Sequence, residues 1–189
     1  MGELKIEMNR DRLTPQQIGK VFFEVLKLEA KIINTTMEDI MTLVEQPKPK
    51  VDLKHIKDEL IYLNIYIIYQ AIFSRFKSSF DEIEFCLKEE LKRFIEEQIS
   101  KESVLQIIIN VNNALIGYME QHNNTIARDA NGSNGLVKFS HYISTRVLGE
   151  EAGDDIRYVM YMSSYYVSRL TGLVKVIDNA IELISRNQR

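Results

Sequence analysis

The chain has 189 residues, 45% of them hydrophobic and 27% charged, with 24 basic and 27 acidic side chains and a formal net charge of −3. This composition excludes an intrinsically disordered chain, and the even mixture of charges excludes the clustered basic surface typical of nucleic-acid-binding proteins. A single cysteine, Cys86, excludes an intrachain disulfide. We therefore expect one domain over residues 1–189, with no nucleic-acid partner, no metal and no other cofactor.

The N-terminal segment, residues 1–13, is charged throughout and contains no apolar stretch typical of a secretory signal. We interpret it as a disordered tail and expect a cytoplasmic protein. The first helix is predicted to begin after Thr14, where the sequence TPQQ has the spacing of a capping box with proline at the first helical position. Apolar residues then recur at helical spacing to about Gln46, and the prolines of the interhelix linker 47–50 end the helix.

A second helix is predicted for about Asp52–Lys77, and it contains an uncharged segment, residues 60–74. This segment is too short for a bilayer core, which needs about 20 apolar residues, so we predict no membrane association. At helical spacing the segment presents one ridge of tyrosine and phenylalanine and a second ridge of isoleucine. A helix with two apolar ridges must contact at least two neighbours, which indicates the central helix of a bundle.

The remainder of the chain predicts four more helices. A capping box and an amphipathic pattern indicate a third helix with a charged outer face, and the last helix follows two aspartates that suit a helix N-terminus. The four predicted ranges are about 79–99, 104–122, 136–148 and 156–185, with a polar loop at 122–135 and Gly149 after the fifth helix. The predicted fold class is all-α: an antiparallel helical bundle of about six helices with long first and last helices.

The first and last predicted helices are each about 45 Å long at a rise of 1.5 Å per residue, which is long for one compact domain of this size. Either they bend, with Asn34–Thr36 as a candidate position in the first helix, or they project from the body of the protein. A projecting apolar helix would pair with a second copy of the chain. We favour this second interpretation and expect a homodimer.

Most of the nine tyrosines lie on the second and last predicted helices, several of them at helical spacing. If these two faces meet, the hydroxyl groups need hydrogen-bond partners, and Asn64 and Arg169 are among the polar residues available to them. One interpretation is a packed core or a subunit interface. The other is a pocket for a small apolar ligand, and its candidate lining residues are Tyr62, Tyr66, Tyr69, Tyr158, Tyr161 and Tyr165.

Local motifs for catalysis and metal binding are missing from the sequence: it contains no phosphate-binding loop, no nucleophile elbow and no His-Glu-x-x-His. His55 and Glu59 lie one turn apart and could place two ligands on one helix face, but the Glu-x-x-His pairs of a di-iron bundle do not occur. Asp129 begins a segment with oxygen ligands at the spacing of a calcium loop. That segment lacks the central glycine and the final glutamate of such loops, which favours a turn.

Three functions remain open. The missing motifs favour a non-catalytic helical interaction or regulatory protein, dimeric and with a possible protein partner. The alternative is a sensor or carrier that binds a small apolar ligand between the tyrosine-lined helices. An enzyme with a dispersed site is disfavoured, and its candidate residues are His141, Arg146, Asp154 and Asp155, which lie near the polar loop.

Overall fold

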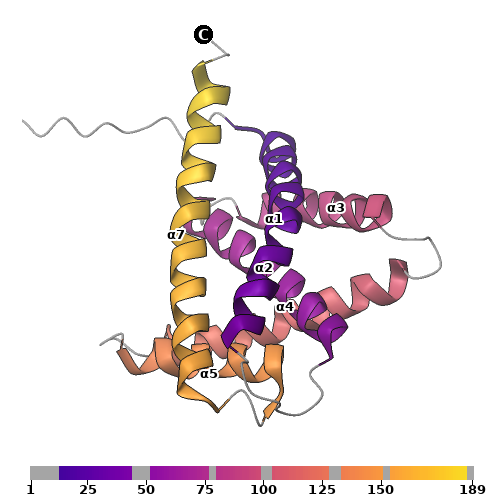
Figure 1. Cartoon of the computed structure of the whole chain (residues 1–189). Helices are drawn as coiled ribbons and strands as arrows, with labels where there is room; N and C mark the ends of the chain where they lie inside the picture. Colours follow the sequence, from indigo (N-terminus) through magenta and orange to yellow (C-terminus); the bar gives the residue numbers. More distant parts are fainter. Residues whose placement is uncertain are drawn as a thin grey trace, which may run out of the picture.

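The computed structural model describes residues 13–43, 52–76, 80–98, 104–127, 133–150 and 154–186. Within these ranges the chain is helical and contains no strand (Figure 1). The helices are α1 (Pro15–Leu43), α2 (Leu53–Phe76), α3 (Phe80–Gln98), α4 (Val104–Thr125), α5 (Ser133–Leu148) and α7 (Ile156–Arg186). The all-α prediction is confirmed for the described part of the chain, and the contacts between helices are compatible with a bundle. The predictions for the tail, apart from Leu13, and for the linker 47–50 lie outside the described residues.

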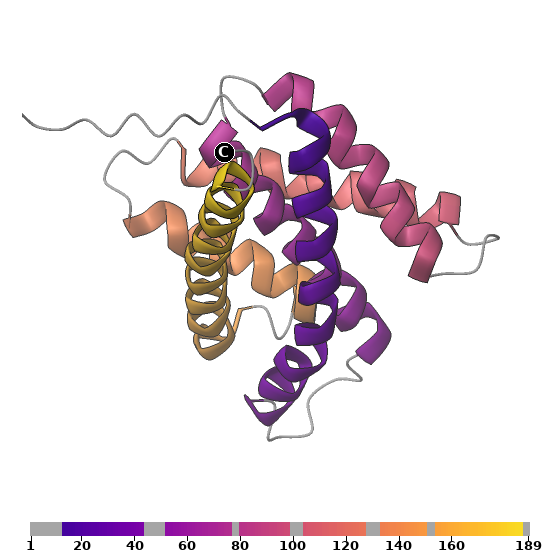
Figure 2. The same ribbon diagram turned by 90° about the horizontal axis from the view of Figure 1, so that it is seen from above.

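The first helix begins as predicted. The Thr14 amide donates to Gln17 Oε1 at 2.8 Å, and the Gln17 amide donates to Thr14 Oγ1 at 3.3 Å, which is the reciprocal pair of a capping box. The helix continues through residues 34–36, where Thr36 Oγ1 donates to the Ile32 carbonyl at 3.3 Å. Such bonds often bend helices, and the last turns of α1 run in a different direction from the first (Figure 2).

Local chemistry also fixes other helix ends. Asp52 Oδ1 accepts from the Lys54 amide before α2, and Asp155 Oδ1 accepts from the Arg157 amide before α7, both at 2.9 Å. These carboxylates satisfy donors that lack a partner inside the helix. Helix α5 ends at Gly149, whose φ of +84° is readily adopted by glycine alone.

Helices α4 and α5 extend further into the predicted polar loop 122–135 than the sequence pattern indicated. Helix α4 reaches Thr125, whose Oγ1 donates to the Gln121 carbonyl at 2.7 Å, and α5 begins at Ser133. Thr125 is buried, so the inner face of this polar stretch packs against the protein although its sequence is hydrophilic. Residues 128–132 of the loop lie outside the described residues.

Helix α2 lies at the centre of the structure. It contacts α1, α4, α5 and α7, whereas α3 packs mainly on α1 and more weakly on α4. The Tyr66 ring is fully buried and stacks on Tyr118 with ring centroids 5.3 Å apart, and Phe139 of α5 lies 5.9 Å from it. The two apolar ridges of α2 thus pack against several neighbouring helices. None of the described helices is long and apolar enough to cross a membrane.

Helix α7 runs along one side of the structure, and its C-terminal turns extend beyond the other helices (Figure 1). Its contacts with α2 and α5 lie along its inner face. Arg75 of α2 donates to Asp178 of α7 through Nε and Nη2, both at 2.7 Å, and this pair fastens the C-terminal ends of the two helices together.

Candidate functional site

The tyrosine-bearing faces of α2 and α7 do meet. The Tyr165 hydroxyl donates to Asn64 Oδ1 at 2.7 Å, so Asn64 is a partner of the kind expected from the sequence. Tyr161 stacks on Tyr165 with ring centroids 6.3 Å apart. Burial raises the pKa of the Tyr161 hydroxyl to about 12, so it remains protonated at physiological pH.

Several of the six candidate lining tyrosines are core residues. Tyr66, Tyr69 and Tyr158 are 0%, 9% and 2% exposed, and the Tyr69 ring packs edge-on against Phe22 at 5.3 Å. Burial raises the pKa of each of these three hydroxyls. Tyr62 is half-buried, and it alone among the six lines either of the two cavities described below. Binding of a ligand between the tyrosines of α2 and α7 stays a prediction.

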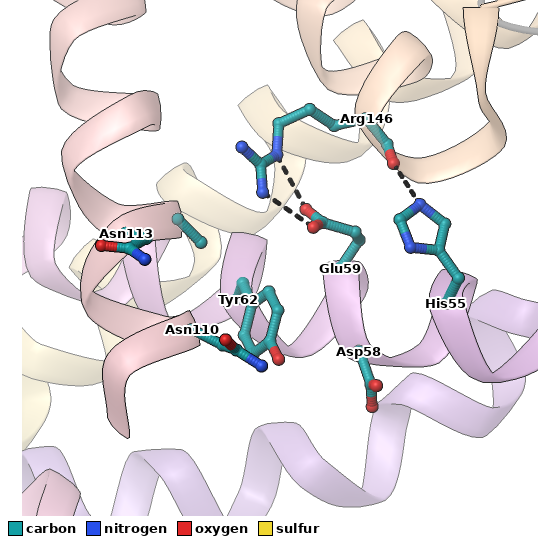
Figure 3. Close-up of a pocket in the computed structure, with 8 residues that line it drawn as sticks. His55, Asp58, Glu59, Tyr62, Asn110, Asn113 and Arg146 are labelled. Atoms are coloured by element: carbon teal, nitrogen blue, oxygen red, sulfur yellow. Dashed lines mark hydrogen bonds and ion pairs between the residues drawn. The ribbon is translucent and has the colours of Figure 1, made fainter. Parts of the chain in front are cut away.

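The first cavity, here called the polar pocket, has a volume of about 330 Å³ and lies between α2, α4 and α5 (Figure 3). Spacings of four and three residues place His55, Glu59 and Tyr62 on neighbouring turns of α2, facing the other two helices. The lining residues are His55, Asp58, Glu59, Tyr62, Asn110, Asn113, Ala114 and Arg146.

A buried ion pair forms one wall of the polar pocket. Arg146 donates through Nε to Glu59 Oε2 at 2.8 Å and through Nη2 to Oε1 at 2.7 Å, and the Tyr118 hydroxyl donates to Oε2 at 3.2 Å. The guanidinium also lies 5.1 Å from the centre of the Tyr118 ring. Burial is the largest single effect on the pKa of Arg146 and lowers it, but hydrogen bonds with Glu59 and Tyr142, together with the charges of Tyr118 and Glu59, outweigh burial and raise the pKa. Because Glu59 already accepts three hydrogen bonds, it is poorly placed to act as a base.

His55 and Asp58 form the outer part of the same pocket. His55 Nε2 donates to the main-chain carbonyl of Arg146 at 2.8 Å, so both members of the His55–Glu59 pair bind Arg146. In Figure 3 the Asp58 side chain points away from this group. Burial raises the pKa of the Asp58 carboxyl, and burial together with the charge of Asp58 raises the pKa of Tyr62. Among the described residues no three His, Cys, Asp or Glu side chains gather in a metal-binding cluster.

The four residues considered for a dispersed active site do not lie together in the structure. Arg146 belongs to the polar pocket, whereas His141 Nε2 pairs with Asp154 Oδ1 at 2.9 Å on the surface, with side chains 50% and 75% exposed. Asp155 pairs with Arg157 at 2.7 Å beside the start of α7. His141 does face an acidic group, as an active site there requires. The pair is open to water, however, and not enclosed in a cleft.

The second cavity, here called the apolar cavity, has a volume of about 850 Å³ and lies between α1, α2, α3 and α4. It shares Asp58, Tyr62 and Asn110 with the polar pocket, so these three residues separate the two spaces. Its apolar walls come from all four helices and comprise Leu26, Ile33, Ile61, Ile65, Phe94, Ile95, Ile107 and Val111.

The apolar cavity has exposed polar side chains at its rim and buried side chains at its floor. Lys54, Lys57 and Gln106 at its rim are exposed, whereas most of the apolar wall residues are buried. Two polar side chains also belong to the buried lining: Asn64, which is 2% exposed, and Glu29, which is 5% exposed and pairs with Arg169 of α7. This combination suits a ligand that is mostly apolar and has few polar atoms.

Few features of the sequence indicate this cavity. Glu29 falls within the apolar stripe of α1, and Asn64 falls within the uncharged segment of α2; each is a polar residue at a position that faces the interior. That mismatch is the one signal that could have indicated them. Asn110 and Asn113 have no such signal, because both are exposed and a polar residue is expected at an exposed helix position.

Comparison of the chain with protein-family models, with curated proteins and with solved structures found no match. We therefore infer the function from the chemistry of the two cavities. In the polar pocket the main charged groups, Glu59 and Arg146, already bind each other. The apolar cavity has a larger volume, walls of mostly buried apolar side chains and a small number of polar groups.

Proposed function

We propose that the protein is a non-catalytic sensor or carrier that takes up a small, largely apolar molecule in the apolar cavity. The observation that carries this proposal is the cavity itself, with about 850 Å³ of space between four helices. Ligand sites of proteins span about 300–1,000 Å³ and are lined mainly by apolar side chains. The proposed position differs from the sequence-based one: the ligand lies between α1, α2, α3 and α4, and not between the tyrosines of α2 and α7.

The residues around the cavity favour binding over catalysis. Glu59 and Arg146 of the neighbouring pocket bind each other, and Glu29 binds Arg169. Each of these charged groups is thus held in an ion pair and is a poor candidate for a nucleophile or a general base. Transfer of an apolar molecule from water to the cavity supplies about 25 cal/mol for each Å² of apolar surface buried.

Binding of an uncharged hydrophobic dye such as Nile red tests this proposal. The wild-type chain should enhance the dye fluorescence in a saturable manner. Val111→Trp fills the cavity with an indole ring from α4, because Val111 is 1% exposed and lines it, and this variant should lose most of the enhancement. Val137→Trp on the exposed face of α5 is the matched control and should behave as the wild type. Equal dye binding by both variants would contradict the proposal.

A second candidate function is a helical interaction protein that works as a homodimer, with an antiparallel bundle of about six helices in each subunit. The exposed face of α4 favours it, because four large apolar residues follow one another there at helical spacing. They are Leu105, Ile109, Ile116 and Met119, which are 70%, 42%, 55% and 46% exposed.

Sedimentation equilibrium tests the dimer. A face of this kind is covered by a partner in many stable assemblies, and the expected mass is twice that of the chain. Ile116→Lys should shift the protein to the monomer, whereas Lys138→Ile on the exposed face of α5 should leave the mass unchanged. A monomeric wild-type chain at micromolar concentration would exclude this candidate.

A further inference from the structure

The floor of the apolar cavity contains a hydrogen-bond donor without a partner. Asn64 is 2% exposed, its Oδ1 accepts from the Tyr165 hydroxyl at 2.7 Å, and its Nδ2 has no partner among the described residues. If the amide were turned over, Oδ1 would be the unpartnered atom and Nδ2 would meet the tyrosine. A buried polar group of this kind is uncommon in native proteins, and it lines a space large enough for a ligand.

The second polar group of the floor is a carboxylate. Glu29 is 5% exposed and reaches the cavity from α1, whereas Asn64 reaches it from α2. The charge of Glu29 is balanced by Arg169, which pairs with it from α7. Tyr165 lies between these groups: burial is the main cause that raises the pKa of its hydroxyl, and the charge of Glu29 adds to the effect.

A ligand head group that enters this floor meets an amide N–H and a carboxylate whose charge is already neutralised. A hydroxyl group satisfies both, because it accepts one hydrogen bond and donates another. A primary amide does the same through its carbonyl and its NH₂ group. Glu29 is already paired with Arg169, so a carboxylate or an ammonium head would bring a further charge into the floor with no counter-ion of its own.

We propose that the ligand is an amphipathic molecule with an uncharged head group, an alcohol or a primary amide, which hydrogen-bonds to Asn64 and Glu29 while its apolar body fills the cavity. This inference depends on the proposed ligand-binding function. The lysines at the rim of the cavity allow a different binding mode. Lys54 and Lys57 are exposed there, and an anionic head held by these two lysines would place the apolar body inward with nothing bound to Asn64.

Competition against bound Nile red distinguishes these arrangements without any mutation. The test compounds share one phenylbutyl body: phenylbutanol, phenylbutanamide, phenylbutanoate and phenylbutylammonium, with butylbenzene as the hydrocarbon of similar size. The alcohol and the amide should displace the dye at concentrations about tenfold or more below those of both charged compounds. Tightest binding by phenylbutanoate would overturn the inference and would indicate the lysines of the rim.

The variant Asn64→Leu tests the role of Asn64 directly, because the leucine side chain has the same branching as asparagine but no hydrogen-bond donor. It should weaken phenylbutanol about tenfold and leave butylbenzene unchanged or more tightly bound. Asn124→Leu, at an exposed position near the end of α4, is the matched control. Equal weakening of the alcohol and the hydrocarbon would refute the role of Asn64, while binding of the hydrocarbon would still support the cavity. If none of the five compounds displaces the dye, the ligand-binding function fails together with the inference.

Discussion

Replacing Arg146 by methionine removes the cation that joins α5 to α2. Glu59, its partner, has a side chain 9% exposed, and its carboxylate accepts two hydrogen bonds from the guanidinium. Without the arginine this carboxylate must remain charged in a poorly solvated position or take up a proton. Either outcome costs free energy that the unfolded chain does not pay, because there Glu59 is surrounded by water.

The magnitude follows from the burial of the two partners. Removal of one member of a buried ion pair destabilises a protein by about 3–5 kcal/mol. Two features lower the value here. The Arg146 side chain is 28% exposed, so water already solvates part of the pair, and the Tyr118 hydroxyl keeps its hydrogen bond to Glu59. We therefore expect Arg146→Met to lower the free energy of unfolding by about 2–3 kcal/mol, which corresponds to a melting temperature about 5–10 °C lower for a domain of this size.

Urea unfolding followed by circular dichroism measures this change. Lys88→Met is the control, since the Lys88–Glu84 pair lies on the surface with side chains 58% and 41% exposed and its removal should cost about 0.5 kcal/mol or less. The double variant Glu59→Met/Arg146→Met should recover part of the stability lost in Arg146→Met, because it leaves no buried charge without a partner. If Arg146→Met costs no more than Lys88→Met, the reasoning from burial is refuted.

Three further predictions concern titration and helix ends. Burial raises the pKa of Asp58 above 3.8, the ordinary value for this group. The folded protein should therefore lose stability as the pH rises from 3.8 through the raised folded value. Asp58→Asn should remove this part of the pH dependence of the urea midpoint. Burial lowers the pKa of His122 below 6.5, so stability should fall as the pH falls from 6.5 through the lowered value. An NMR titration of the His122 ring should place its midpoint below 6.5. His122→Gln should remove this loss of stability at low pH. Gly149→Ala should cost about 1 kcal/mol in thermal unfolding because alanine is strained at a φ of +84°, and a cost near zero would contradict the assigned backbone conformation.

The agreement between sequence and structure is closest where structure depends on neighbouring residues. The capping box at Thr14, the end of α5 at Gly149 and the start of α7 after Asp155 each involve atoms within a few residues of one another. The central position of α2 was also predictable, since a helix with two apolar ridges and no charge over residues 60–74 has no face suited to water. The C-terminal end of α4 and the start of α5 were less predictable, because hydrophilic residues next to a loop can continue a helix when one face of that helix remains buried.

The candidate site depended on contacts between distant parts of the chain. The sequence pairs Glu59 with His55 by spacing and Arg146 with His141 by proximity, whereas the structure joins Glu59 to Arg146 across 87 positions. Tyr66 and Tyr69 were candidates for a ligand pocket, as the alternative to a packed core or a subunit interface, and their rings are buried in the core. Periodicity reports which face of a helix is apolar. It does not report which helix that face meets, or at what rotation.

The amino-acid sequence by itself determined that this protein is helical in its described part, where several of its helices begin and end, and that α2 is buried on most sides. These properties follow from backbone hydrogen bonding and from the spacing of apolar residues along one element. Only the tertiary structure decided that Glu59 meets Arg146 and that α1, α2, α3 and α4 leave a cavity with Asn64 at its floor. A cavity is the volume that packed side chains fail to fill, and its size changes with shifts of a few ångströms between helices that no local pattern records.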